Sequence, residues 1–455
     1  MRRLLKYVLS FVAVITLVSC QKPWATSKQL TKAKLEKISE TYNNTLSQST
    51  YDSYMAFAKK FTSLVIQTSI EKEGEKSLGV SIPDAYFCLA ILGAISDDAA
   101  RSDVLSYLEL ASVEDMRTAV RELLAVAGTL YKNADGKLMG GYNLNSIWLD
   151  PEQVQLVKEK DEQLYQDLEE VFDASTYHNA LTSKRANDYM KENGLKDMPV
   201  PNIELDDDNP PAIGVMSAYY CLDYFKEETK QRYEQQYKSK VHKMDYTYAN
   251  NISQVDYIQT REHGNVYEGN GFYGADSQIQ NLNMTYFLPN DSNALPSSIL
   301  NDVLDKNYQL KQGKYIDYEG VEHDSTIFDV IVKAPYFSLD NKIDLEYEKL
   351  KTILPVITKK GAGERLAESI LGEDLFLAFI KQFSVMKYNY DGFYSCSVTI
   401  AGNYASSAAS PTYETFELVL DHPYIFEVNK QIRTGQTWNQ LPLVIGEIVV
   451  PEYED

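Results

Sequence analysis

The feature that most constrains the fold is a change in hydrophobic period along the chain. Residues 51–130 carry apolar side chains at helical spacing; for example, Phe57, Phe61 and Leu64 fall on one side of a helix. From Lys243 onward, segments such as "VDYIQT" and "FDVIVKAPYFSL" alternate with the period of two that strands require. Helices first and antiparallel strands later predict an α+β fold.

The middle of the chain predicts a mixture of both elements. Residues 142–150 form one expected strand, and residues 211–225 form another that is central because it is apolar on both faces. Residues 151–172 predict a helix with proline at its first position. Residues 182–194 predict a further helix with glycine at its end.

Length and charge bound the class of protein. A chain of 455 residues with 44% hydrophobic residues is able to bury a large core. The formal net charge of −21 repels phosphate backbones, and we therefore expect no nucleic-acid partner.

The N-terminus, "MRRLLKYVLSFVAVITLVSC", has the layout of a secretory signal, because basic residues precede an apolar run too short to span a bilayer comfortably. Its end resembles a bacterial lipobox, which implies a mature chain beginning at a lipidated Cys20. An ordinary signal peptide with a chance cysteine is the alternative. We expect a signal peptide over 1–19, a lipidated cysteine and polar tether with a weak helix over 20–50, and a single domain over 51–455. The protein would be exported and anchored to a bacterial membrane, in the periplasm or at the cell surface.

Motifs for enzymes, metals and cofactors are absent from the sequence. It contains no nucleophile elbow, zinc-protease motif, phosphate loop or dinucleotide fingerprint. No two of its five histidines lie within ten residues of each other. The acidic run "ELDDDNPP" lacks the ligand spacing of a calcium loop and predicts a solvated loop. We expect no enzyme, metal or cofactor, and we expect Cys88 and Cys221 to be small core residues.

The segment "LVLDHPYIFEV" resembles the signature of the serpin family, with Asp421, His422 and Pro423 matching and Tyr424 in place of phenylalanine. Eight further segments resemble serpin elements in the family's order: "YMAFAKKF", "GVSIPDAYFCLAIL", "YNLNSIWLDP", "RANDYM", "GVMSAYYCLDYF", "LNMTYFLPND", "FDVIVKAPYFSL" and "LPLVIGEIVVP". The resemblance implies a serpin-like α+β fold, with N-terminal helices packed on large antiparallel or mixed β-sheets and an exposed reactive-centre loop.

No charged residue lies between Asp391 and Glu414. The serpin resemblance implies that this segment is protease bait, which after cleavage inserts as an extra strand in the main sheet. The implied hinge residues are Gly392, Phe393, Tyr394, Ser395, Cys396 and Ser397. The implied scissile window comprises Tyr404, Ala405, Ser406, Ser407, Ala408 and Ala409. The window holds no Lys or Arg, so the implied targets are elastase-, subtilisin- or chymotrypsin-like serine proteases, or papain-like cysteine proteases, rather than trypsin-like enzymes.

The loop should form a detachable ribbon beside a gap in the main sheet. Its inward positions would be Phe393, Ser395, Ser397, Thr399 and Ala401, whereas Cys396, Val398 and Ile400 would face water. Inhibitory serpins have a small residue where Phe393 stands, followed by an acidic residue and a run of Ala, whereas Phe393 and Tyr394 are bulky. Ser217 and Gln382 occupy the places of an Asn and its partner His, so the hydrogen bonds that control opening of the sheet would be rewritten or missing.

Three alternatives to an inhibitor follow. One is a non-inhibitory serpin-fold envelope lipoprotein that binds a partner or ligand, and another is a nutrient-binding lipoprotein of a different fold. In the third reading the loop is a plain Ser/Ala linker.

Overall fold

The computed structural model describes residues 28–33, 38–39, 43–132, 138–157, 161–195, 200–224, 230–239, 242–243, 246–247, 251–278, 282–317, 319–389, 392–395 and 412–451. The expected signal peptide, Cys20, Cys396, Ser397 and the whole scissile window lie outside these residues.

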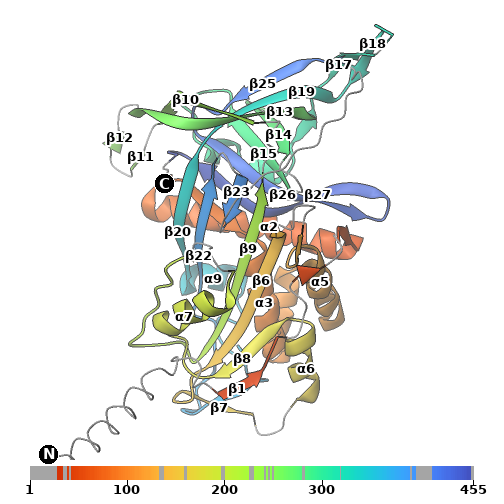
Figure 1. Cartoon of the computed structure of the whole chain (residues 1–455). Coiled ribbons are helices and arrows are strands. Elements are labelled where there is room, and N and C mark those ends of the chain that lie inside the picture. Colours follow the sequence, from red (N-terminus) through yellow and green to blue (C-terminus); the bar gives the residue numbers. More distant parts are fainter. Residues whose placement is uncertain are drawn as a thin grey trace, which may run out of the picture.

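The helices come mostly from the first half of the chain, as the hydrophobic period predicted (Figure 1). Several begin with a side-chain cap; Ser47, Asp97 and Ser112 each accept a hydrogen bond from the backbone N–H three residues on. The described helices are α2 (Gln48–Glu73), α3 (Pro83–Ile95), α4 (Asp98–Tyr107), α5 (Val113–Val126), α6 (Glu162–Glu170), α7 (Ser183–Asn193), α8 (Ser297–Leu304) and α9 (Tyr347–Ile353).

The main sheet has the strand order β1-β8-β6-β9-β23-β22-β20, and β5 pairs with both β2 and β6 beside this path. Strands β9 and β22 are long and antiparallel to their outer neighbours β6 and β20. The bounds are β1 (Lys28–Thr31), β2 (Ile38–Ser39), β5 (Leu130–Lys132), β6 (Leu138–Leu149), β8 (Ala174–His178), β9 (Ile213–Tyr224), β20 (Phe337–Glu346), β22 (Phe379–Tyr388) and β23 (Gly392–Ser395).

The second sheet has the order β25-β19-β13-β14-β15-β26-β27-β4, with β10, β16 and β3 pairing beside this path. Its bounds are β3 (Thr45–Leu46), β4 (Leu78–Ser81), β10 (Lys230–Ser239), β13 (Asn251–Gly269), β14 (Phe272–Gln278), β15 (Leu282–Pro289), β16 (Tyr308–Leu310), β19 (Ile327–Pro335), β25 (Thr415–Val419), β26 (Tyr424–Thr434) and β27 (Thr437–Ile448). Three small sheets join β11 (His242–Lys243) to β12 (Tyr246–Thr247), β17 (Gly313–Ile316) to β18 (Glu322–Ser325) and β24 (Thr412–Tyr413), and β7 (Val154–Leu156) to β21 (Ala367–Ser369).

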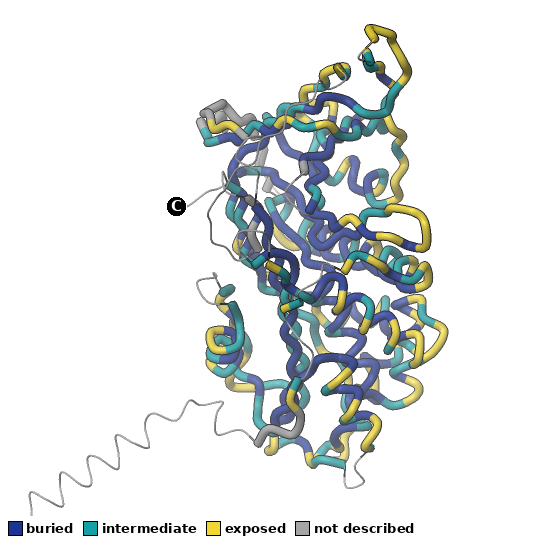
Figure 2. The backbone as a smooth tube through the Cα atoms, turned by 45° about the vertical axis from the view of Figure 1, so that its right-hand side comes forward, coloured by how far each residue is buried: buried dark blue, intermediate teal, exposed yellow. Residues whose placement is uncertain are grey.

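Helices cover both faces of the main sheet. On one face α3 packs against β9, within a large core that α2, α5 and the second sheet share. On the other face α7 buries Ala186, Tyr189 and Met190 against Trp148 of β6 and Tyr220 of β9. The buried strands and helices form the interior of the molecule, and loops at its edges carry most of the exposed residues (Figure 2).

Three sequence expectations need correction. Residues 151–172 form strand β7 and the short helix α6 instead of one helix. The expected tether contributes β1, β2 and β3 to the two large sheets, and none of its described residues before residue 48 is helical. Cys221 is buried as expected, but Cys88 is only partly buried.

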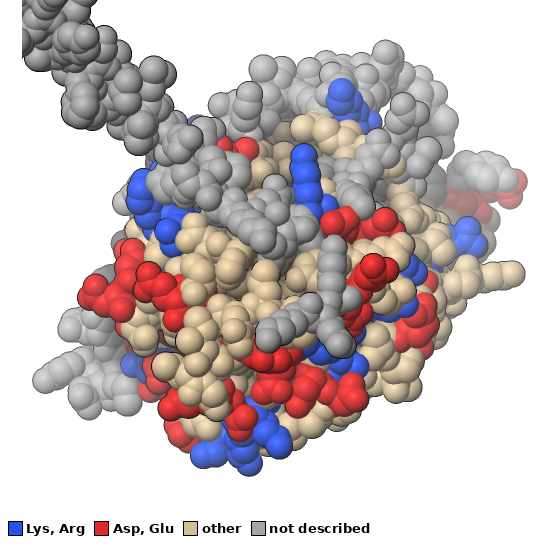
Figure 3. Space-filling model, turned by 90° about the horizontal axis from the view of Figure 1, so that it is seen from below, with Lys and Arg blue, Asp and Glu red and all other residues tan. Residues whose placement is uncertain are grey.

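No helix in the described part of the chain is both long and apolar enough to cross a membrane. The face shown in Figure 3 carries several groups of Asp and Glu with Lys and Arg between them, in keeping with the acidic composition.

Candidate functional site

The strand β23 lies inside the main sheet, between β9 and β22. Its four residues pair with β9 from Gly392 opposite Tyr224 to Ser395 opposite Cys221. On its other side, Phe393 lies opposite Tyr388 of β22. Strand β23 therefore bridges only the C-terminal ends of β9 and β22, which are their upper ends in Figure 1.

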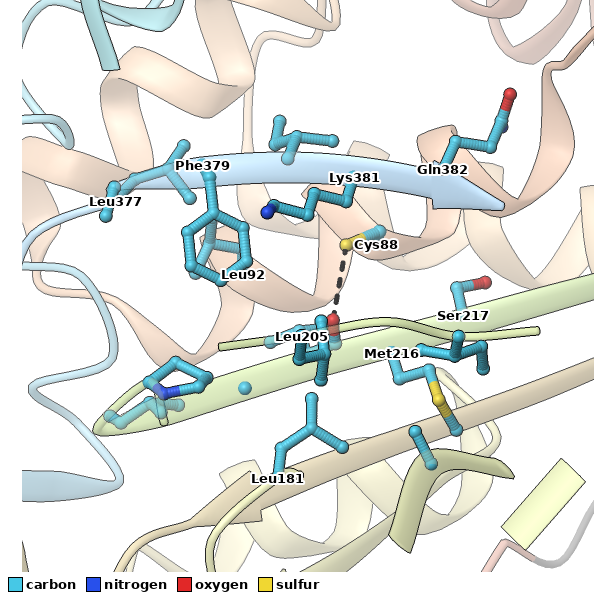
Figure 4. A pocket seen from close by; sticks show the side chains of 18 of the residues that line it. Cys88, Leu92, Leu181, Leu205, Met216, Ser217, Leu377, Phe379, Lys381 and Gln382 are labelled. Carbon is cyan, nitrogen blue, oxygen red and sulfur yellow. Dashed lines mark hydrogen bonds between the residues drawn. The ribbon is translucent and has the colours of Figure 1, made fainter. Parts of the chain in front are cut away.

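Below β23, β9 and β22 enclose a gap. The inner edges of residues 213–220 and 379–386 pair with no strand among the described residues, although their outer edges pair with β6 and β20. A cavity of about 470 Å³ occupies this space. Figure 4 shows the two strands facing each other across it. Open strand edges of this kind accept a further strand, because their N–H and C=O groups are available for pairing.

Helix α3 forms the floor of the cavity. Its residues Asp84, Cys88 and Leu92, one turn apart, line the cavity. The Cys88 thiol lies 3.8 Å from the carbonyl oxygen of Val215 on β9, as drawn in Figure 4. Burial raises the pKa of this thiol to about 12, so it is protonated at neutral pH.

Gln382 ties β22 to the start of α3. Its Nε2 donates to the Ser81 carbonyl at 2.7 Å, and its Oε1 accepts the Ser81 N–H at 3.2 Å. The same Nε2 lies 3.1 Å from Asp84 Oδ2. Burial raises the pKa of the Asp84 carboxyl to about 6, and hydrogen bonds from Ser81 and Gln382 oppose that shift.

Ser217 lies across the gap on β9. Its Oγ is buried and has no hydrogen-bond partner among the described residues. The two positions that the resemblance paired, Ser217 and Gln382, thus both line the cavity, but the bonds described for Gln382 go to Ser81 and Asp84. Gln382 therefore links β22 to Ser81 and Asp84 at the start of α3.

Phe393 is fully buried in the large core. Its ring centroid lies 6.4 Å from that of Phe426, which also packs 5.0 Å from Phe337. The ribbon expected beside the gap therefore begins, at Gly392–Ser395, as a strand within the main sheet. The bulky side chain already occupies its inward position.

Buried polar groups fix the upper end of β9. Asp223 accepts the N–H of Leu282 at 2.6 Å through Oδ2 and that of Tyr224 at 2.9 Å through Oδ1. Lys430 is also buried and donates to the carbonyl of Val126, and burial lowers the pKa of its ammonium group to about 8. These bonds join the upper end of the main sheet to the second sheet and to α5.

The motif "DHPY" follows the loop in the sequence and joins β25 to β26. His422 bonds to Asp421 at 2.7 Å and to the carbonyl of Pro289 at 2.8 Å through its two ring nitrogens. The motif therefore fixes the corner at which the chain enters the second sheet, and it holds the downstream anchor of the loop.

Comparisons with known proteins give the class to which this architecture corresponds. No family model and no curated protein matches the sequence. Solved serpin structures match with a probability of 1.00. The native state of tengpin, a thermophilic serpin, has a TM-score of 0.63 at 16% identity and covers 93% of this chain and 99% of that one. The Arabidopsis serpin AtSerpin1, in its native stressed conformation, has a TM-score of 0.61 at 17% identity, with coverage of 89% and 100%.

Human thyroxine-binding globulin in complex with thyroxine also matches, with a TM-score of 0.61 at 11% identity and coverage of 89% of this chain and all of that one. The chain therefore has the serpin fold. The latent state of tengpin gives a lower TM-score, 0.59, than its native state.

Sequence reasoning missed the role of Asp84. Its position in the first turn of a helix after a proline gave no sign that Gln382, nearly 300 residues later, would lie against it. It also missed the anchor that Phe393 provides, because a phenylalanine in a small-residue hinge read only as a departure from the serpin pattern.

Proposed function

We propose that this protein is a serpin-like inhibitor that traps serine or papain-like cysteine proteases by loop cleavage and insertion into the main sheet. The observation that carries the proposal is the gap between β9 and β22, which continues directly below the inserted strand β23. A cut loop would extend β23 downward through this gap.

The register of β23 defines how much chain the gap would accept. Because Gly392 lies opposite Tyr224, one-for-one continuation would bring residue 403 opposite Ile213, the first residue of β9. On the other side, Phe393 opposite Tyr388 would bring residue 402 opposite Phe379, the first residue of β22. Both edges would accommodate residues 396–402, and β9 would also accommodate residue 403, so the insert ends just before the scissile window.

The inward positions of this insert are small and polar, as the cavity wall requires. In the continued register Thr399 would lie between Ser217 and Gln382, and Ser397 would lie next to Ser384. A hydroxyl at position 399 would supply the partner that Ser217 Oγ lacks among the described residues.

In the inserted state the outward positions would lie beside apolar side chains, whereas the sequence expectation placed them toward water. In the same register Val398 would lie between Ala218 and Phe383, and Ile400 would lie beside Met216. These three neighbours pack against the core cluster under α7. Apolar residues at alternate positions of the loop are therefore suited to insertion.

The scissile window, residues 404–409, favours elastase-, subtilisin- or chymotrypsin-like enzymes over trypsin-like ones, because it contains no basic residue. The test is incubation with an elastase-type protease followed by a denaturing gel. We expect an SDS-resistant adduct with the mass of the protease plus the chain cut within the window. Cleavage that leaves the protease fully active and forms no adduct would contradict trapping.

The alternative is a non-inhibitory serpin-fold protein that holds a ligand or partner. The buried anchor Phe393 and the Gln382 link favour it, because both hold the sheet in its present state. One similar structure, thyroxine-binding globulin, is a complex with a small molecule. In that case cleavage of the loop would leave the melting temperature unchanged.

We also propose that Cys20 carries the lipid that anchors the protein to a bacterial membrane, on the strength of the lipobox-like N-terminus. Replacement of Cys20 by Ser should release the protein from the membrane fraction and abolish incorporation of labelled fatty acid. Unchanged labelling would contradict the assignment.

A further inference from the structure

A two-stranded hairpin, β17–β18, projects from the end of the molecule that carries the loop's downstream flank. It is the outermost feature at the upper right of Figure 1, and its tip is exposed in Figure 2. We name residues 313–317 and 319–325 the flank hairpin. Its strands pair from Gly313 opposite Ser325 to Ile316 opposite Glu322.

The flank hairpin is joined to the downstream end of the loop. Strand β24 pairs with β17, with Tyr413 opposite Tyr315 and Thr412 opposite Ile316. Glu414 extends this link, because its N–H donates to the Lys314 carbonyl at 3.0 Å and its Oε2 accepts the Lys314 N–H at 3.2 Å.

The turn of the hairpin is a preformed structure. Asp317 Oδ1 accepts the N–H groups of Glu319 and Val321, both at 2.9 Å, and Asp317 Oδ2 bonds to His323 Nε2 at 2.7 Å. These bonds lower the pKa of the Asp317 carboxyl, the backbone N–H of Val321 making the largest contribution and His323 the next. The Tyr315 ring stacks on His323, with centroids 5.0 Å apart. A rigid element costs little entropy when it docks.

The tip presents both apolar and acidic side chains to solvent. Ile316 and Val321 are 45% and 49% exposed. Glu319, Glu322 and Asp324 are exposed beside them, and residues 313–325 contain four acidic residues against one Lys. Lys314 forms an ion pair with Glu322, and the other charged groups around these apolar side chains are acidic. Apolar groups surrounded by a net charge of one sign are typical of a surface that binds a partner of opposite charge.

The short distance between the flank hairpin and the scissile window indicates which molecule would bind the hairpin. Thr412 is three residues beyond Ala409, the last residue of the scissile window, so an extended chain separates them by roughly 10 Å. A protease that holds the window must therefore place its surface next to the hairpin. We propose that the flank hairpin is an exosite for the protease that attacks the loop, and that it selects enzymes with a basic surface beside the leaving-group side of their cleft. This inference rests on the proposed function.

The test measures the second-order rate at which a strongly basic elastase-type protease cuts the window in the full-length protein. The triple variant E319Q/E322Q/D324N removes the tip's negative charges and keeps the turn residue Asp317. The matched control is E152Q/E170Q/E368Q, which neutralises three exposed acids near β7, α6 and β21, away from the loop's end of the molecule. Equal melting temperatures verify that both variants are folded.

We expect the tip variant to be cut about 10-fold more slowly at low salt, and the difference to fall below about 2-fold at roughly 0.5 M salt, because screening removes electrostatic steering. The variant I316S/V321S should slow cleavage at all salt concentrations. A rate equal to that of the control in both variants would overturn the exosite.

These outcomes separate the two proposals. Rapid, tip-dependent cleavage without a covalent adduct would refute trapping and support the exosite. Adduct formation at the same rate in the wild type and in the tip variants would refute the exosite alone. If the elastase-type protease does not cut the loop, both proposals are overturned.

Discussion

The substitution Val398→Asp tests the register that joins the loop to the gap. In the continued register this side chain would lie between Ala218 and Phe383, under α7. Burying a valine contributes about 2 kcal/mol, and burying a carboxyl there instead costs about 2 kcal/mol more even when it is protonated. The cleaved, inserted state should therefore lose about 4 kcal/mol of stability.

Melting of the cleaved protein measures this loss. For a chain of this size the unfolding entropy converts about 4 kcal/mol into a fall of roughly 5 °C in melting temperature. The intact protein should melt as the wild type does, since the substitution lies in the loop. The control Ser410→Asp adds the same charge beyond both the insert and the scissile window, and we expect it to change neither form. Equal melting of cleaved wild-type and cleaved Val398→Asp protein would refute the register.

Three further predictions concern residues around the gap. Phe393→Ala should lower the unfolding free energy of the intact protein by about 3–5 kcal/mol, because it empties a fully buried site; a loss below about 1 kcal/mol in urea unfolding would show that β23 is not anchored. Ser217→Ala should leave the intact protein as stable or make it slightly more stable, since a buried hydroxyl without a described partner is removed, whereas a loss above about 1 kcal/mol would contradict that environment. The pKa of Asp84 is raised from 3.8 to about 6, so the folded state holds this proton more tightly and stability should fall as pH rises from about 4 to 6. In the variant Asp84→Asn this group no longer titrates, so the unfolding free energy should fall by up to about 3 kcal/mol less than in the wild type over this pH range. A pH profile equal to that of the wild type would contradict the raised pKa.

Local sequence pattern was sufficient for the elements that periodicity or caps define. The apolar run over 211–225 forms the central strand Ile213–Tyr224, and the helix expected over 182–194 spans Ser183–Asn193. Residues 151–172 were misread because Val154 and Leu156 pair with Ser369 and Ala367, more than 200 residues away, which no local pattern reveals.

The gap itself could be expected only through the serpin resemblance, because it is defined by strands whose sequences lie far apart. The structure places Gln382 at the gap, but its hydrogen bonds to Ser81 could not be named from the sequence, since they depend on where the backbone of Ser81 lies in three dimensions. The apolar neighbours proposed for the outward face of the inserted loop could not be expected from local sequence, because the α7 cluster beside that face comes from a segment some 200 residues earlier.

Hydrogen exchange before and after a single cut in residues 404–409 tests the central claim most directly. If the loop fills the gap, backbone amides on the inner edges of residues 213–220 and 379–386 that exchange rapidly in the intact protein will become strongly protected after the cut. Unchanged exchange at both edges in protein shown to be fully cleaved would contradict insertion of the loop.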